Sequence, residues 1–183
     1  MTIKNLGLMA LYNFPLAIEC LEDLSQYCDA LIVRFDANGD QKLLNYAVNH
    51  KKIIKVLYTK EKWNSWNFRE DLVGLTDSIN PELLLFLDED EKFEKDIRED
   101  IYEFRQKPEA KYMRFLFKMV PNNLEPWPSD HHVKVIKWQP KLTYYPYPGW
   151  ARTVSYLGIP GASYNAKTKI IHYHYAHGNR DKH

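Results

Sequence analysis

The sequence predicts an α/β fold: a Rossmann-like mixed central sheet with helices on both faces and a loop-rich, aromatic carboxyl-terminal part. Two observations support this prediction. In the first half of the 183-residue chain, short apolar runs alternate with segments of helical periodicity, which is typical of parallel strands joined by helices. After residue 105 the segments become aromatic and interrupted by proline, and strands no longer alternate with helices. We expect a single domain over residues 1–183.

The first elements alternate regularly. We expect a strand over Leu6 to Tyr12, then a helix whose apolar residues recur at helical spacing, then a strand over Ala30 to Phe35. Asn13 is a candidate N-cap of that helix, with Pro15 in its first turn. "KLLNYAV" then predicts a second helix and "KIIKVLY" a third strand.

A further helix, "WNFREDLVGLTDSI", leads to the most unusual stretch, "PELLLFLDEDEKF". Leu83 to Leu87 is apolar on both faces, which is typical of a central parallel strand covered on both sides. Asp88 is therefore expected at the carboxyl end of that strand, the edge at which open α/β sheets bind ligands.

The second half has a different character. An acidic helix is expected over Glu94 to Arg105, followed by a long strand at "KYMRFLFKMV" and shorter strands at "HVKVIKW" and "KIIHYHY". Aromatic residues collect here, notably in "KLTYYPYPGW". They could pack on the apolar faces of a sugar, or they could simply be core.

Composition excludes several classes of function. The chain has 25 basic and 24 acidic residues. It therefore lacks the overall positive charge that would indicate a nucleic-acid partner. Cys20 and Cys28 show no zinc-site spacing and fit reduced thiols better than a disulfide framework. The first apolar run is too short for a membrane span. We therefore expect a soluble, cytoplasmic protein without a transmembrane segment.

The four consecutive acids, Asp88 to Glu91, allow two interpretations. They could form a solvated turn followed by a helix N-terminus, where carboxylates are favourable. Alternatively, if strand geometry continues, Asp88 and Asp90 point the same way and offer two hard oxygen ligands to Mg²⁺ or Mn²⁺ bound to a phosphate. Such an ion would relieve the repulsion between the acids.

Taken together, these segments resemble glycosyltransferases of the GT-A fold, particularly the inverting group called family 2. The resemblance covers roughly Leu6 to Tyr175. It rests on the order of five segments: "LMALYNFPLAIECLEDL", the acid loop of "LIVRFDANGD", the Arg-bearing helix "WNFREDL", the DxD element "LLLFLDEDE", and the late His-containing strand "IIHYHY".

The resemblance implies roles for individual residues on the donor side. Asp36 or Asp40 resembles the acid that holds the nucleoside. Asp88 resembles the first DxD acid, near the ribose and the metal, and Asp90 resembles the last DxD acid, a direct ligand of Mn²⁺ or Mg²⁺. Arg69 resembles an arginine that faces the nucleotide, although it could equally be a surface residue paired with a neighbouring acid.

The carboxyl-terminal half supplies further candidates. His172 and His174 share one face of a strand and resemble the family's late histidine that completes the metal shell. An inverting enzyme also needs a carboxylate base. The Glu-Asp pair seen in many family members is absent here, so Asp130 is the candidate, with Glu125 near it in sequence. Asp130 could instead cap a turn.

The expected function is therefore metal-dependent transfer of a sugar from a nucleoside-diphosphate sugar to a glycan or other hydroxyl acceptor, with inversion. Residues 1–92 would bind the nucleotide sugar, and residues 93–183 would form the acceptor side. Two alternatives remain open. A metal-dependent nucleotidyltransferase should have a Gly-rich loop after the first strand, and "LYNFPLAIE" has none. A non-catalytic glycan-binding module would not need acids at the ends of successive strands.

Overall fold

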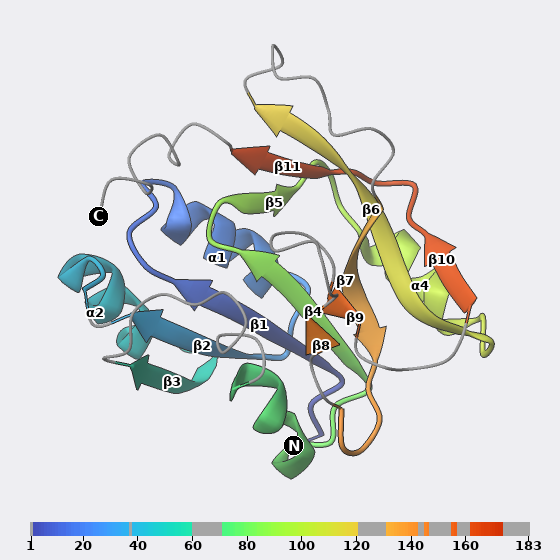
Figure 1. Cartoon of the computed structure of the whole chain (residues 1–183), viewed down its shortest axis with the longest axis horizontal. Coiled ribbons are helices and arrows are strands. Elements are labelled where there is room, and N and C mark those ends of the chain that lie inside the picture. The colour runs from blue at the N-terminus through green and yellow to red at the C-terminus, as the bar shows by residue number, and fades with distance from the viewer. Residues whose placement is uncertain are drawn as a thin grey trace.

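The computed structural model of the chain describes residues 2–36, 38–59, 71–120, 131–142, 145–146, 155–156 and 162–173. Within these residues, nine strands form one mixed sheet and two short strands form a separate pair (Figure 1). The nine strands are β1 (Asn5–Leu11), β2 (Ala30–Asp36), β3 (Ile53–Thr59), β4 (Leu83–Asp88), β5 (Glu91–Phe93), β6 (Ala110–Val120), β7 (His131–Lys137), β10 (Ala162–Asn165) and β11 (Ile170–Tyr173). The antiparallel pair is β8 (Tyr145–Pro146) and β9 (Ser155–Tyr156).

The order of strands in the sheet is β3-β2-β1-β4-β7-β6-β11-β5, and β10 pairs with β6. The first half of this order is parallel, since β1 pairs in parallel with both β2 and β4, and β2 with β3. The carboxyl ends of these strands therefore meet at one edge, where Leu11, Asp36 and Asp88 end β1, β2 and β4. The alternation of strands and helices correctly predicted this parallel half.

The second half of the sheet is mixed. β7 runs antiparallel to both β4 and β6, whereas β11 is parallel to β6 and antiparallel to β5. Figure 1 shows β11 between β5 and β6, so a late segment of the chain lies beside the strand that begins with the last of the four acids. Neither β5 nor β10 is evident from the sequence pattern.

Helices cover both faces of the sheet. They are α1 (Ala17–Ser25), α2 (Gln41–Asn49) and α4 (Arg98–Arg105), and a short 3₁₀ helix, η1 (Thr76–Ser78), follows the described helical residues 71–74. Apolar side chains of α1, α2 and α4 join one core, and Leu72 and Val73 join a second core on the opposite face. Leu84 and Leu85 enter different cores, which confirms that β4 is buried on both faces.

The start of α1 differs from the prediction. The helix begins at Ala17, Leu16 occupies the N-cap position, and no side chain caps it. Asn13 is therefore not the N-cap. The amide of Ala17 donates to the carbonyl oxygen of Phe14 at 3.0 Å, and this turn lets the Phe14 ring enter the core before the helix starts.

Cys20 and Cys28 are both free and buried. Burial raises the pKa of both thiols, so they behave as small apolar groups rather than as nucleophiles. Among the described helices, none combines the length and the apolar character needed to cross a bilayer.

Gly7 of β1 is predicted to be essential for packing α1 onto the sheet. A Cβ atom at Gly7 would lie 2.3 Å from Leu31 Cδ2 and 2.8 Å from Cys28 Sγ. Gly7→Ala is therefore expected to lower the free energy of unfolding by about 1–3 kcal/mol, the usual cost of overpacking. Gly74→Ala is the control, since a Cβ atom there meets nothing within 4 Å. Thermal unfolding of both variants checks this, and equal melting temperatures would contradict it.

Candidate active site at the carboxyl edge of the sheet

The four acids form a turn between β4 and β5. β4 ends at Asp88, the chain turns through Glu89 and Asp90, and β5 begins at Glu91. The side chain of Asp88 is 37% exposed, whereas Glu89, Asp90 and Glu91 are all buried. Glu91, the last of the four acids, thus begins a strand rather than a helix, and the condition that strand geometry continues from Asp88 through Asp90 is not met.

Hydrogen bonds within the turn and to distant segments explain its shape. Glu91 Oε2 accepts from the backbone N–H of Asp88 at 2.9 Å, which folds the chain back on itself. Glu89 Oε2 accepts from the backbone N–H of Tyr12 at 2.6 Å, which ties the turn to the end of β1. The buried ammonium group of Lys134, in β7, donates to Glu91 Oε2. Glu89 and Glu91 therefore accept from different donors, and this arrangement reduces the repulsion between the two carboxylates.

His172 approaches the turn from β11. It pairs in register with Glu91 of β5, and the neighbouring Tyr173 N–H donates to the carbonyl oxygen of Asp90 at 2.9 Å. This pairing brings His172 Nε2 to 3.4 Å from Asp90 Oδ2. The other ring nitrogen, Nδ1, lies 3.4 Å from Met119 Sδ.

The charges around the turn shift two pKa values. Burial disfavours the charged form of His172, but the hydrogen bond to Asp90 and the nearby carboxylate of Glu91 outweigh burial and raise the pKa of the ring. Burial raises the pKa of Glu91, and the ammonium of Lys134 opposes this rise. For both side chains, burial disfavours the charged form and a nearby opposite charge favours it.

The acid loop after β2 adjoins this turn. Asp36 is buried, and its Oδ1 accepts from the backbone N–H of Asn38 at 2.8 Å. Asp40 is the N-cap of α2, where its Oδ1 accepts from the Lys42 N–H at 2.8 Å. The Asp40 N–H donates to the carbonyl oxygen of Tyr12 at 2.9 Å. Because the N–H of Tyr12 donates to the acid turn, one residue connects the two candidate regions.

Four of the candidate residues lie outside the described residues: Arg69, Glu125, Asp130 and His174. One acid close to Arg69 in the sequence, Asp71, is among the described residues. Asp71 forms an ion pair with the buried Arg34, with Oδ2 and Nη1 2.7 Å apart.

Asp90 and His172 fit a shared divalent ion. Two ligands at right angles around an ion, with bonds of about 2.1 Å, lie about 3 Å apart, close to the 3.4 Å between Asp90 Oδ2 and His172 Nε2. A carboxylate oxygen with an imidazole nitrogen suits Mn²⁺. No group of three or more His, Cys, Asp or Glu side chains among the described residues could enclose a metal. Oxygens of a bound ligand would have to complete the coordination.

Sequence reasoning missed the residues that build the turn. The sequence pattern assigns no role of their own to Glu89, Glu91 and Lys134. The signal was the length of the acid run itself, because a metal site needs fewer than four adjacent carboxylates. The remaining acids imply partners elsewhere in the chain.

Comparison with solved structures supports the fold. TarS residues 1–349 from S. aureus has a TM-score of 0.52 and 19% identity over 64% of this chain and 36% of that chain, and its complex with UDP-GlcNAc gives the same TM-score and identity. GalNAc-T7, with UDP, GalNAc and Mn²⁺, has a TM-score of 0.63 and 9% identity over 94% of this chain. Both neighbours are glycosyltransferases of the GT-A fold, and the chain described here has that fold.

The matched part of GalNAc-T7 is 44% of that chain, so this chain spans less than half the length of either neighbour. No protein-family model and no curated protein matches the sequence.

Proposed function

We propose that this chain is a metal-dependent glycosyltransferase that moves a sugar from a nucleoside-diphosphate sugar to a glycan or other hydroxyl acceptor. The observation that carries the proposal is the meeting of Asp90 and His172, 3.4 Å apart, at the edge where β1, β2 and β4 end. Strand pairing brings the two segments together, and it leaves a carboxylate oxygen and an imidazole nitrogen at a spacing that suits two ligands of one ion. We further propose that the protein resembles the inverting, DxD-containing group of family 2.

On the donor side, the proposed roles follow the two connected regions. Asp36, with Asp40 as the alternative, would hold the nucleoside, and the turn from Asp88 to Asp90 would face the diphosphate. Asp90 and His172 would hold Mn²⁺ or Mg²⁺, with Asp88 and His174 as further candidate ligands. When bound, such an ion stabilises the negative charge that grows on the leaving diphosphate. Residues 1–92 would thus form the nucleotide-sugar half.

On the acceptor side, residues 93–183 would bind the hydroxyl substrate, and Asp130 would accept its proton. Beside the acid turn, His132 stacks on Phe117 with ring centroids 3.9 Å apart, and the His172 ring lies 5.3 Å from Phe117. All three side chains are partly exposed. Aromatic surface of this kind packs well against the apolar face of a sugar ring.

The solved neighbours agree with this choice of donor. TarS has been crystallised with UDP-GlcNAc, and GalNAc-T7 with UDP, GalNAc and Mn²⁺. For the present chain, a uridine nucleotide sugar with Mn²⁺ is therefore the first donor to test.

A thermal-shift panel of nucleoside diphosphates and nucleotide sugars, with and without Mn²⁺ or Mg²⁺, tests the proposal. A ligand that binds only the folded state raises the melting temperature, so at least one nucleotide sugar should do so in a metal-dependent way. Release of nucleoside diphosphate from that donor then separates an enzyme from a glycan-binding module. If no nucleotide sugar changes the melting temperature with either metal, the proposed function is wrong.

Asp36→Asn is expected to raise the KM for the donor about tenfold and to change kcat little, because contacts to the nucleoside are equally strong in ground and transition states. The new amide side chain retains an acceptor for the Asn38 N–H, so the turn should persist. Asp40→Asn tests the alternative acid and preserves the helix cap. Steady-state kinetics at varied donor concentration measures both variants. A large fall in kcat at saturating donor would show that the acid acts in the chemical step instead.

A further inference from the structure

Lys134 lies where β7 departs from both of its neighbours. Next to β6, the register shifts: Val135 pairs with Met113 and Val133 pairs with Arg114, so Lys134 is skipped. Next to β4, β7 pairs only as far as Val135, and the last part of β4 continues beyond it to the acid turn. Irregularities of this kind redirect a side chain and are common beside active sites.

The redirected side chain is buried beneath the acid turn. It is 7% exposed, its Nζ donates to Glu91 Oε2, and the same Nζ lies 3.6 Å from Asp88 Oδ2. Its Nζ also lies 5.3 Å from the centre of the Phe117 ring. A lysine loses much of its hydration in such a place, so the carboxylates must compensate for that loss.

We infer that Lys134 is a positioning residue of the donor site, which holds Asp88 both through Glu91 and directly. The same Glu91 oxygen that accepts from Lys134 accepts from the Asp88 backbone N–H, and the ammonium group also attracts the Asp88 carboxylate. The backbone and the side chain of Asp88 therefore share one anchor. This inference rests on the proposed function, since it assigns Asp88 to the donor.

A purely structural role would give a different result. If Lys134 served only to neutralise buried Glu91, then removing both charges together would restore wild-type behaviour. Replacement of a buried ion pair by neutral groups of similar size is often tolerated, whereas removal of one partner is not. The double variant Lys134→Met/Glu91→Gln distinguishes the two roles. Its new amide side chain can still accept from the Asp88 N–H, while the ammonium beside the Asp88 carboxylate is gone.

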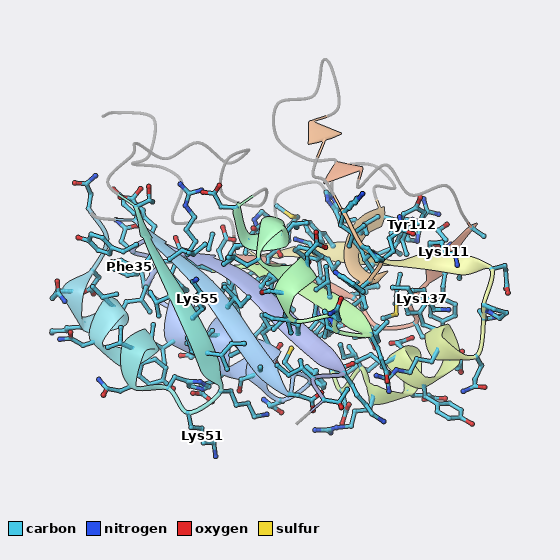
Figure 2. The ribbon with its side chains drawn as sticks, turned by 90° about the horizontal axis from the view of Figure 1, so that it is seen from below. Phe35, Lys51, Lys55, Lys111, Tyr112 and Lys137 are labelled. Carbon is cyan, nitrogen blue, oxygen red and sulfur yellow. The ribbon has the colours of Figure 1, made fainter. Side chains whose placement is uncertain are left out.

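The first measurement needs no donor. Amide hydrogen exchange of the segment from Phe86 to Phe93 should be faster in Lys134→Met than in wild type, because the turn loses its anchor. Lys137→Met is the matched control on the same strand. Lys137 pairs with Leu83 at the opposite end of β4, and Figure 2 shows it far from Phe35 of the carboxyl edge. Unchanged exchange in Lys134→Met would overturn the inference.

The second measurement is titration of UDP with Mn²⁺ into the folded variants. The double variant is expected to bind about tenfold more weakly than wild type, the typical effect of losing one charge-assisted contact. Asp88→Asn should weaken binding in the wild-type background and have a much smaller effect in the double variant, because coupled residues are not additive.

The outcomes separate the inference from the proposed function. Wild-type affinity in the double variant, or equal effects of Asp88→Asn in both backgrounds, would reduce Lys134 to a counter-charge and overturn the inference. If the wild type binds no nucleoside diphosphate or nucleotide sugar, the proposed function fails. In that case the assignment of Asp88 to a donor fails with it, whatever the exchange experiment shows of the turn.

Discussion

Asp90→Asn is expected to lower sugar transfer by roughly two to three orders of magnitude, the usual scale for loss of a group that stabilises charge in the transition state. Asp90 is buried and lies beside His172, so its carboxylate is the best-placed ligand for a divalent ion in the turn. The substitution retains the size of the side chain but removes the negative charge. The variant should therefore fold normally and bind UDP more weakly when Mn²⁺ is present.

Calorimetric titration of UDP with Mn²⁺, together with transfer assays, measures this effect. Asp96→Asn is a suitable control, because Asp96 is an exposed acid whose partner is the exposed Arg98. Its replacement should leave both donor binding and transfer unchanged. Equal affinity for UDP in Asp90→Asn and wild type would remove the metal role from Asp90.

His172→Ala is expected to weaken Mn²⁺ binding at least about 10- to 100-fold, because the loss of a residue that only orients a metal ligand already has an effect of that size. The loss should be larger in Mn²⁺-supported than in Mg²⁺-supported activity, because Mg²⁺ prefers oxygen ligands more strongly than Mn²⁺ does. Activity as a function of metal concentration, measured for both metals, gives the two affinities.

His131→Ala is the control for this experiment. His131 is a partly exposed histidine at the start of β7, and its register partner is Leu116 of β6, so its loss should affect both metals equally little. If His172→Ala lowers Mn²⁺-supported and Mg²⁺-supported activity by the same factor, the ring supports the turn and does not bind the ion. A structure with Mn²⁺ and UDP in which the ring lies well beyond about 2 Å from the metal would mean the same.

The parallel half of the fold was predictable because its signals are local. Each strand from β1 to β4 is mostly apolar in sequence, and the segments between them have helical spacing or turn residues. β5 was not predictable, since its three residues include Glu91 and Lys92, and nothing in their immediate surroundings favours a strand. What makes them a strand is pairing with β11, which comes from a segment about 80 residues later.

The candidate site was predictable only in part, for the same reason. The pattern located Asp88 at a strand end and drew attention to His172, because acids and alternating histidines are visible in the sequence. The partners of Glu89 and Glu91 are not visible there. One is the backbone of Tyr12 and the other is Lys134 at a register shift, and neither position can be deduced without knowing which strands are neighbours.

The pairing of β11 with β5 also has a consequence for how the protein is made. Contacts between segments far apart in the sequence form slowly, because a long loop must close before they stabilise the chain. During synthesis, residues 1–93 leave the ribosome well before residues 170–173, so β5 emerges as an unpaired edge strand whose first residue is the last of the four acids. The charge of those acids discourages association with other chains while the edge is exposed. We therefore expect the acidic turn to limit association of the nascent chain with other chains before any substrate binds.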